Sequence, residues 1–104
     1  MDNGMEKMTL YFKSLFEAEE VFKALSTPVR LKIMEMIYEN DSLSMNDLAE
    51  ALNLTNGAIS MNVTKLEEAG LVTIKTAAGK RGAMKLVRPR FERLVIDIDR
   101  KSVV

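Results

Sequence analysis

The sequence contains no cysteine and no histidine among its 104 residues. Without cysteine no disulfide framework can form, and a zinc or soft-metal site built from cysteine and histidine ligands is excluded. Histidine and cysteine are therefore not available as general base or nucleophile, and the sequence shows no glycine-rich phosphate loop and no pair of acids in an apolar setting. Carboxylates and lysines could still catalyse, but nothing in the sequence groups them. We expect a protein that is not an enzyme and that uses no metal and no cofactor.

Long apolar runs are also absent. No stretch of about 18 uninterrupted apolar residues occurs, and residues 1–8 are polar, which argues against a membrane span or a secretory signal. No repeat, low-complexity tract or linker divides the chain, which has only 2 prolines and 5 glycines. A chain of this length supports one modest core. We expect a single domain over residues 1–104, a cytoplasmic location and no membrane partner.

Apolar spacing predicts a first helix over Met8–Leu25. Large apolar residues recur there at alternating intervals of four and three, and they are Tyr11, Leu15, Ala18, Phe22 and Leu25. The row is broad for a surface helix, so part of it should cover the core. The remainder resembles the heptad row of a two-fold dimer contact.

Two further helices are announced by capping residues. Thr27 can cap a helix whose first residue, Pro28, loses no hydrogen bond that the helix would have used. The apolar stripe of this helix consists of Val29, Ile33 and Ile37. Ser44 is expected to cap the next helix, with Asp47 supplying negative charge in its first turn.

A tight turn and an amphipathic helix come next. Leu54 is the apolar plug of the turn, and Thr55 can cap the helix that follows it. The buried stripe of that helix consists of Ile59, Val63 and Leu66. Gly70 ends it, because glycine is the residue best suited to a left-handed exit. The opposite face is small, hydroxylic or cationic, as a helix in a DNA major groove requires, and it carries Gly57, Ser60, Met61, Thr64 and Lys65.

Beyond Gly70 the apolar period changes from helical to alternating. The pattern predicts two antiparallel strands over 71–76 and 83–88. Their apolar faces are expected to carry Val72 and Ile74 on the first strand, and Met84 and Leu86 on the second. Together the elements predict a mainly α (α+β) winged helix-turn-helix with about four helices, a β-hairpin wing and a C-terminal strand over Leu94–Ile98.

The connection between the two strands combines glycine with positive charge. Gly79 and Gly82 are able to take positive φ, and Lys80 and Arg81 lie between them. Such a tip can reach a phosphate or a minor groove.

Net charge is zero, yet the two halves of the chain differ strongly. Residues 1–54 hold 5 basic and 10 acidic side chains, whereas residues 55–104 hold 10 basic and 5 acidic ones. A basic run alone is usually a solvated face. Here it follows a helix that already suits a groove, so we expect one end of the molecule to attract polyanions.

Three blocks of sequence, Ala24–Met34, Leu52–Ser60 and Lys65–Val72, resemble the ArsR-type winged-helix transcription regulators of bacteria and archaea. The resemblance covers roughly residues 20–88. It implies a homodimer that binds a palindromic operator through the helix from Thr55 to Ala69, often as a repressor. It further implies that the base-reading positions are Asn56, Gly57, Ser60, Met61 and Asn62.

The sequence departs from this family in two respects. Many ArsR-type regulators sense metals through cysteine and histidine, which this chain lacks, so a site of that kind is excluded. The family often ends in a helix that completes the dimer, whereas residues 91–99 alternate like a strand. We expect the dimer elements to be residues 8–25 and 91–99.

The expected DNA contacts lie on a recognition helix over residues 55–69 and a wing over residues 71–88. They are Thr55, Asn56, Gly57, Ser60, Met61, Asn62, Thr64, Lys65, Lys75, Lys80, Arg81 and Lys85. For Asn62, reading of adenine and a hydrogen bond within the protein are both open. Arg30 is expected to be structural and to pair with a nearby acid.

We conclude from the sequence that the chain is a sequence-specific transcriptional regulator whose partners are double-stranded DNA and a second copy of itself. Two alternatives stay open. A winged helix can instead dock a protein, with the basic face against an acidic surface. The chain can also be the DNA-binding part of a longer regulator.

Overall fold

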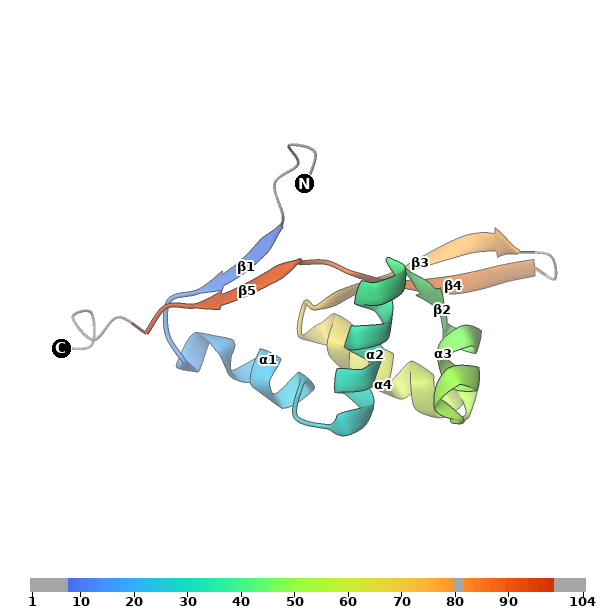
Figure 1. The fold of residues 1–104 in the computed structure, drawn as a ribbon, viewed down its shortest axis with the longest axis horizontal. Coiled ribbons are helices and arrows are strands. Elements are labelled where there is room, and N and C mark those ends of the chain that lie inside the picture. Colours follow the sequence, from blue (N-terminus) through green and yellow to red (C-terminus); the bar gives the residue numbers. More distant parts are fainter. Residues whose placement is uncertain (1–7, 80–81, 99–104) are drawn as a thin grey trace.

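The computed structural model describes residues 8–79 and 82–98. Figure 1 shows the helices gathered on one side of a sheet whose hairpin extends beyond them. The elements are β1 (Thr9–Phe12), the 3₁₀ turn η1 (Phe16–Ala18), α1 (Glu19–Ala24), α2 (Pro28–Asn40), β2 (Leu43–Ser44), α3 (Met45–Leu52), α4 (Asn56–Glu68), β3 (Val72–Gly79), β4 (Gly82–Pro89) and β5 (Arg93–Ile96). This is a winged helix, as the sequence predicted.

The helices begin at the predicted caps. The hydroxyls of Thr27, Ser44 and Thr55 accept hydrogen bonds from backbone N–H groups three residues later, at 3.3, 3.0 and 3.0 Å. Gly70 leaves α4 with φ of 82°, which confirms the left-handed exit. Asn53 also takes positive φ, 57°, and thereby ends α3 in the tight turn before α4.

The core lies between the helices and one face of the sheet. Its fully buried side chains come from the helices and from the base of the wing, and they include Ile33, Ile37, Leu48, Ile59, Val63, Leu66, Val72 and Val87. The three apolar residues of the α4 stripe are all completely buried. Burial of this stripe fixes which face of α4 points outward.

The three-stranded sheet has the order β2-β4-β3, with antiparallel neighbours. Val87 pairs with Ile74 and with Leu43 and is completely buried. The expectation that Met84 and Leu86 form the apolar face of β4 is therefore wrong. Residues directly opposite in a ladder share a face, so the buried face follows Ile74, and Met84 and Leu86 lie on the other side.

The end of the hairpin uses one of the two predicted glycine positions. Gly82 has φ of 108°, a conformation that favours glycine, whereas Gly79 is not among the described residues with positive φ. Lys80 and Arg81 lie outside the described residues.

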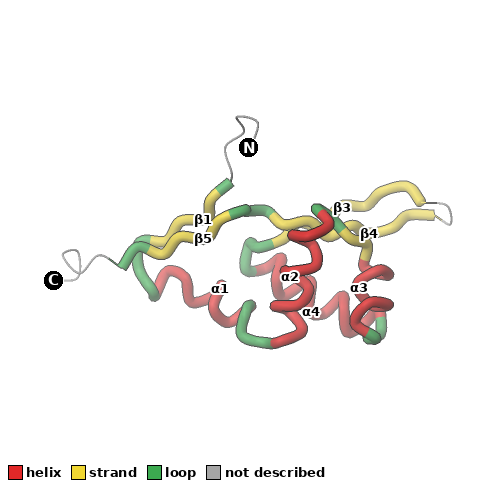
Figure 2. The backbone as a smooth tube through the Cα atoms, viewed as in Figure 1, coloured by secondary structure: helices red, strands yellow, loops and turns green. Residues whose placement is uncertain are grey.

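The predicted helix over Met8–Leu25 is wrong in its first half. Thr9–Phe12 forms β1, which pairs in parallel with β5, and a helix runs only over Glu19–Ala24. Alternation explains the difference, because Leu10 and Phe12 pack against the core while Tyr11 points to the exposed face and its hydroxyl donates to Asp97 Oδ2 at 3.0 Å. The predicted C-terminal strand is confirmed as the partner of β1. Figure 2 shows this two-stranded ribbon at the opposite end of the molecule from the wing.

No helix within the described ranges is both long enough and apolar enough to cross a membrane.

Candidate nucleic-acid interface

The outward face of α4 is small, polar and exposed. Its exposed residues are Asn56, Gly57, Ser60, Met61, Thr64 and Lys65. Met61 is 60% exposed, a large fraction for an apolar side chain. A Cβ added at Gly57 would meet only the Thr55 hydroxyl, at 4.0 Å, so the space over this residue is open to a partner. No acid lies in the first turn of α4, and its acids, Glu67 and Glu68, lie in the last.

The N-terminus of α4 is suited to an anion. Thr55 accepts from the N–H of Ala58 and so satisfies one of the free donors of the first turn. The remaining donors and the helix dipole favour a negative group such as a phosphate. The capping role of Thr55 is thus observed, and a phosphate contact beside it stays a prediction.

Asn62 is tied to the protein through both ends of its amide. Its Oδ1 accepts from Arg30 Nη1 at 3.0 Å, and its Nδ2 donates to the carbonyl of Ala58 at 2.8 Å. Reading of a base would require these bonds to be given up. The geometry therefore favours the second of the two roles left open for Asn62, a hydrogen bond within the protein.

Arg30 joins three helices, a role that sequence reasoning only partly found. Its Nε donates to the carbonyl of Ala24 at 2.6 Å and its Nη2 to the carbonyl of Lys23 at 3.4 Å, in addition to the bond to Asn62. It is structural, as expected, but its partners are two carbonyls and an amide rather than an acid. The partners lie on α1 and α4, so no spacing within α2 could have indicated them.

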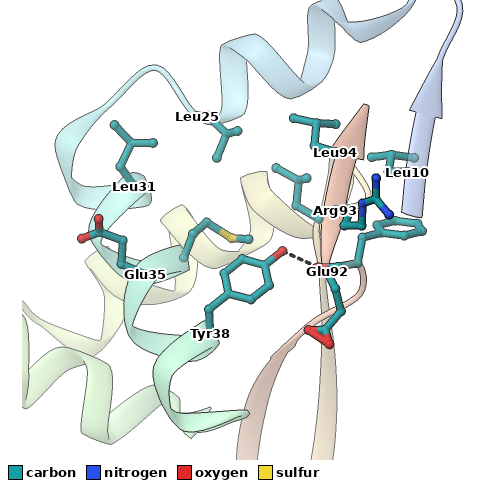
Figure 3. A pocket seen from close by; sticks show the side chains of 11 residues that line it. Leu10, Leu25, Leu31, Glu35, Tyr38, Glu92, Arg93 and Leu94 are labelled. Carbon is teal, nitrogen blue, oxygen red and sulfur yellow. Dashed lines mark hydrogen bonds between the residues drawn. The ribbon is translucent and has the colours of Figure 1, made fainter. Parts of the chain in front are cut away.

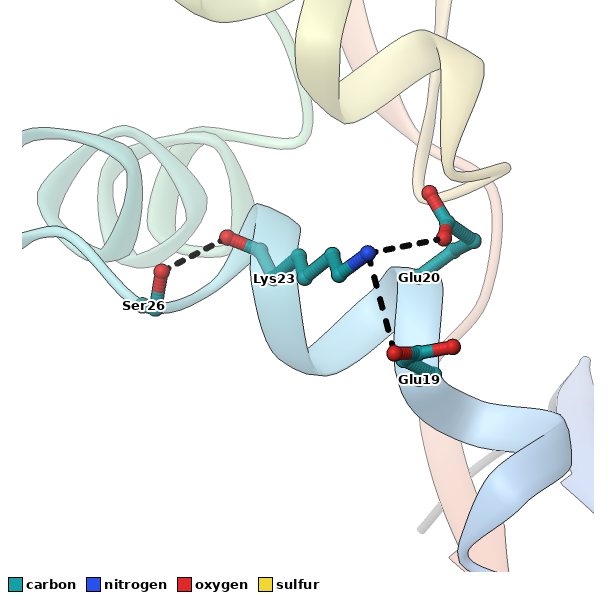
Figure 4. Close-up of polar contacts among 4 residues, drawn as sticks. All are labelled: Glu19, Glu20, Lys23 and Ser26. Atoms are coloured by element: carbon teal, nitrogen blue, oxygen red, sulfur yellow. Dashed lines mark hydrogen bonds and ion pairs between the residues drawn. The ribbon is translucent and has the colours of Figure 1, made fainter.

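Two acids of α1, Glu19 and Glu20, pair with Lys23. Lys23 Nζ lies 3.6 Å from a carboxylate oxygen of Glu19 and 3.6 Å from one of Glu20, while its carbonyl accepts from the Ser26 hydroxyl at 2.7 Å (Figure 4). This lysine is surrounded by negative charge. The α1 surface is therefore a poor site for a polyanion.

The two predicted lysines of the wing point to opposite faces of the sheet. Lys85 pairs with Thr76, on the same face as the buried Val87, whereas Lys75 pairs with Leu86 on the outer face. The α4 side of the sheet thus carries Lys85. Of these two cations, only Lys85 lies beside the outward face of α4.

A hollow of about 270 Å³ lies where α3, α4 and the wing meet, and it brings part of the predicted site together. Asn56 and Ser60 line it from α4, Lys85 from the wing, and Asn46 from the first turn of α3. Asn46 was not predicted as a site residue. The cap at Ser44 is the signal that could have found it, since it places the start of α3 at this edge.

The described cations of this region are free of ion pairs with acids. No salt bridge within residues 8–79 and 82–98 involves Lys65, Lys75 or Lys85. Farther along, Arg90 lies over the ring of Phe91, 5.2 Å from its centroid, and Arg93 begins β5. The basic run therefore divides between the wing and the segment that leads to the ribbon.

In the part of the chain that the structure describes, no three His, Cys, Asp or Glu side chains are grouped where they could hold a metal ion. Uncharged polar groups, a helix N-terminus and lysines without salt bridges are the features of this surface. Such a set can contact base edges and phosphates.

Comparison with known proteins agrees with this chemistry. Residues 27–73 match a family described as winged helix-turn-helix DNA-binding. The chain is 37% identical over 65 residues to the uncharacterized protein MJ0432 of Methanocaldococcus jannaschii, a match that spans 62% of this chain and 70% of that protein. It is 34% identical over 56 residues to the uncharacterized HTH-type transcriptional regulator MJ1325 of the same organism, spanning 54% of this chain and 63% of the relative.

Two solved structures share the fold. HlyU from Vibrio cholerae superposes with a TM-score of 0.63 at 26% identity, over 71% of this chain and 75% of that one. A transcriptional regulator homologue from Pyrococcus horikoshii superposes with a TM-score of 0.58 at 26% identity, over 68% and 75% of the two chains.

Proposed function

The chain belongs to the winged helix-turn-helix DNA-binding family, and from this we propose that it is a transcriptional regulator that reads an operator with α4. The observation that carries the proposal is the convergence of Asn56, Ser60 and Lys85 around one hollow. Polar side chains on α4 would meet base edges while Lys85 meets a phosphate of the same duplex. A relative named as an HTH-type transcriptional regulator supports the regulatory role.

The proposed contacts divide by chemistry. On α4 the polar tips of Asn56, Ser60 and Thr64 and the thioether of Met61 are the candidates for base edges, with Met61 suited to a thymine methyl. Thr55, Lys65 and Lys85 are candidates for phosphates, and Gly57 permits close approach of the backbone. Lys75, which the sequence also predicted as a contact, is not included because it lies on the other face of the wing. Lys80 and Arg81 at the tip of the wing stay predicted phosphate or minor-groove contacts.

We further propose that the regulator acts as a homodimer. The apolar surface formed by Leu15, Phe16 and Phe22 is exposed, with Phe16 at 89%, and a second copy would cover it. A two-fold dimer would present two α4 helices to a palindromic operator, with centres about 34 Å apart as one DNA turn requires. Repression is proposed on the resemblance of the three sequence blocks to ArsR-type regulators.

The test is a mobility-shift titration against mixed genomic fragments, followed by Met61→Glu on the duplex that binds best. We expect the variant to lose affinity by at least about tenfold, because a carboxylate would be placed against base edges and phosphates. The free energy of unfolding should change by no more than about 0.5 kcal/mol, since Met61 is exposed.

Lys32→Gln is the matched control, because it changes net charge by the same amount from an exposed position on α2. It should bind nearly as tightly as the parent. If Met61→Glu melts normally and binds as tightly as Lys32→Gln, α4 does not enter the groove and a protein-docking module becomes the better hypothesis.

A further inference from the structure

A second hollow, of about 450 Å³, lies on the side of α2 away from the wing tip, between α2 and the start of β5 (Figure 3). Hydrocarbon lines most of it, from Leu10, Leu25, Leu31, Met34, Leu71 and Leu94. We call it the apolar hollow. The hollow leaves apolar side chains exposed to water, and a contiguous exposed apolar surface on a folded protein often marks a binding site.

The charged side chains that line the apolar hollow are Glu35, Glu92 and Arg93, and all three are exposed to solvent. In Figure 3 the carboxylates of Glu35 and Glu92 point away from the leucine side chains. The polar group closest to the interior is the Tyr38 hydroxyl, which donates to the carbonyl of Phe91. Burial, followed by the nearby charge of Glu92, raises the pKa of Tyr38 above its usual 10.0, so the hydroxyl stays protonated over the physiological range.

We propose that the apolar hollow is the binding site of an uncharged apolar small molecule. Its volume lies within the range of about 300–1,000 Å³ typical of ligand pockets, and such pockets are mostly apolar with a few placed polar groups. A charged ligand would have to lose water without finding a partner among the leucines, which is costly. The mouth is open, because Leu31 and Leu94 are 48% and 42% exposed.

The apolar hollow borders elements that hold the DNA-reading helix. Leu71 lies one residue after the glycine that ends α4, and its N–H donates to the carbonyl of Leu66 at 3.0 Å. α2 contributes Leu31 and Met34 to the hollow, and its Arg30 bonds Asn62 on α4. A molecule that fills the hollow therefore contacts both supports of α4. This regulatory part rests on the proposed function, and coupling of this kind must be reciprocal.

The experiment titrates 1-octanol into the full chain labelled at leucine methyl groups and follows the methyl NMR spectrum. We expect saturable shifts at Leu10, Leu25, Leu31, Leu71 and Leu94 and little change at Leu15 and Leu52, which do not line the hollow. Octanoate and octylamine carry the same chain with opposite charges, and each should bind at least about tenfold more weakly.

Two variants locate the site. Leu31→Trp places a larger side chain at the mouth and should weaken octanol binding by about tenfold, whereas Leu15→Trp, the same change at an exposed leucine outside the hollow, should leave it unchanged. Thermal melts of both variants check that each is folded. The proposed binding site is wrong if octanol causes no saturable methyl shifts, or if only Leu15→Trp abolishes them.

A second copy of the chain is the rival occupant of the apolar hollow. If a second copy fills the hollow, the octanol-induced shifts should weaken as protein concentration rises, and Leu31→Trp should change the sedimentation coefficient. Either result overturns the proposal.

The effect on DNA binding is tested separately, by measuring operator affinity with and without octanol. If octanol leaves operator affinity unchanged, the proposed coupling between the apolar hollow and α4 is wrong, but octanol binding in the hollow is unaffected. If the protein binds no DNA even without octanol, the proposed function is wrong and the binding site in the apolar hollow still stands.

Discussion

Arg30 is the residue that most directly holds α4 in place. Its guanidinium satisfies the carbonyls of Lys23 and Ala24 at the end of α1 and the amide oxygen of Asn62. The planar group donates in several directions at once, which no other side chain could do from this position. A polar junction of this type orients a helix without contacting its ligand.

Replacing Arg30 with methionine should lower the free energy of unfolding by about 2 kcal/mol, because hydrogen bonds from a charged donor are removed and the carbonyls stay partly buried. Urea denaturation measures the change. Lys32→Met on the same helix is the control and should stay within about 0.5 kcal/mol. If the two variants are equally stable, the hydrogen bonds of Arg30 make no net contribution to the free energy of unfolding.

Local chemistry was enough to predict the residues that cap helices. Thr27, Ser44 and Thr55 each bond a backbone N–H three residues later, so the partner is fixed by the helix itself. The partners of Asn62 and Arg30 depend on the packing of α1, α2 and α4. Sequence spacing carries no such information, and for this reason the role of Asn62 stayed open.

The wing is an element whose two faces differ in function under the proposed binding mode. Lys85 lies on the α4 side and Lys75 on the outer side, although both were predicted to contact DNA. Alternation identified each lysine as exposed but could not say which face turns toward α4. That depends on the buried Val87 and its partly buried partner Ile74, and the sequence pattern had placed Val87 on the wrong face of β4.

We therefore expect Lys85→Ala to weaken binding to operator and random duplexes by similar factors. The slope of log K against log salt should become shallower by about 0.9 for each phosphate that the variant no longer neutralises. Lys75→Ala is the matched control, with the same change of charge on the other face, and should alter both quantities less. Mobility shifts over a series of salt concentrations provide the comparison. Equal effects of the two variants would argue against docking of DNA on the α4 side of the wing.

The ribbon of β1 and β5 shows why a helical period can mislead. Tyr11 and Leu15 have the spacing of a helix stripe, yet Tyr11 lies in β1 and Leu15 immediately precedes η1. The alternation of Leu10 and Phe12 was equally visible, but a four-residue strand gives a weak signal. Its partner lies near the other end of the described chain, so only the tertiary fold decides between the two patterns.

At the scale of the whole molecule, the wing and the ribbon lie at opposite ends (Figure 1). The exposed apolar residues Leu15, Phe16 and Phe22 follow β1 in the chain, on η1, α1 and the residue before them. Under the proposed function, one end would contact DNA while the other meets a second copy. The sequence predicted that residues 8–25 take part in the dimer. The structure changes the surface offered for that purpose, since Leu25 packs against the core and Phe16 is exposed.

Sedimentation of the parent at micromolar concentration should reveal a dimer, and Phe16→Glu should shift it to monomer, because a charge would be buried in the contact. The fold should persist, since the side chain of Phe16 is almost fully exposed and supports little of the core. Met61→Glu removes an exposed apolar side chain elsewhere and should stay dimeric. A parent that is monomeric with and without DNA would contradict the proposed dimer.

The parallel pairing of β1 with β5 also has a kinetic consequence. Thr9 meets Arg93, so this pairing closes nearly all of the described chain into a loop, whereas β3 and β4 meet across a short hairpin. Closing so long a loop costs chain entropy, so contacts between residues this far apart form late in folding. We therefore expect the folding transition state to contain the hairpin and α4 but not the ribbon.

Ile96→Ala should accordingly speed unfolding and leave the folding rate nearly unchanged in stopped-flow experiments. The amide of Asp97, which donates to the carbonyl of Phe12, should then exchange with solvent by local opening well before the amide of Leu71 at the end of α4.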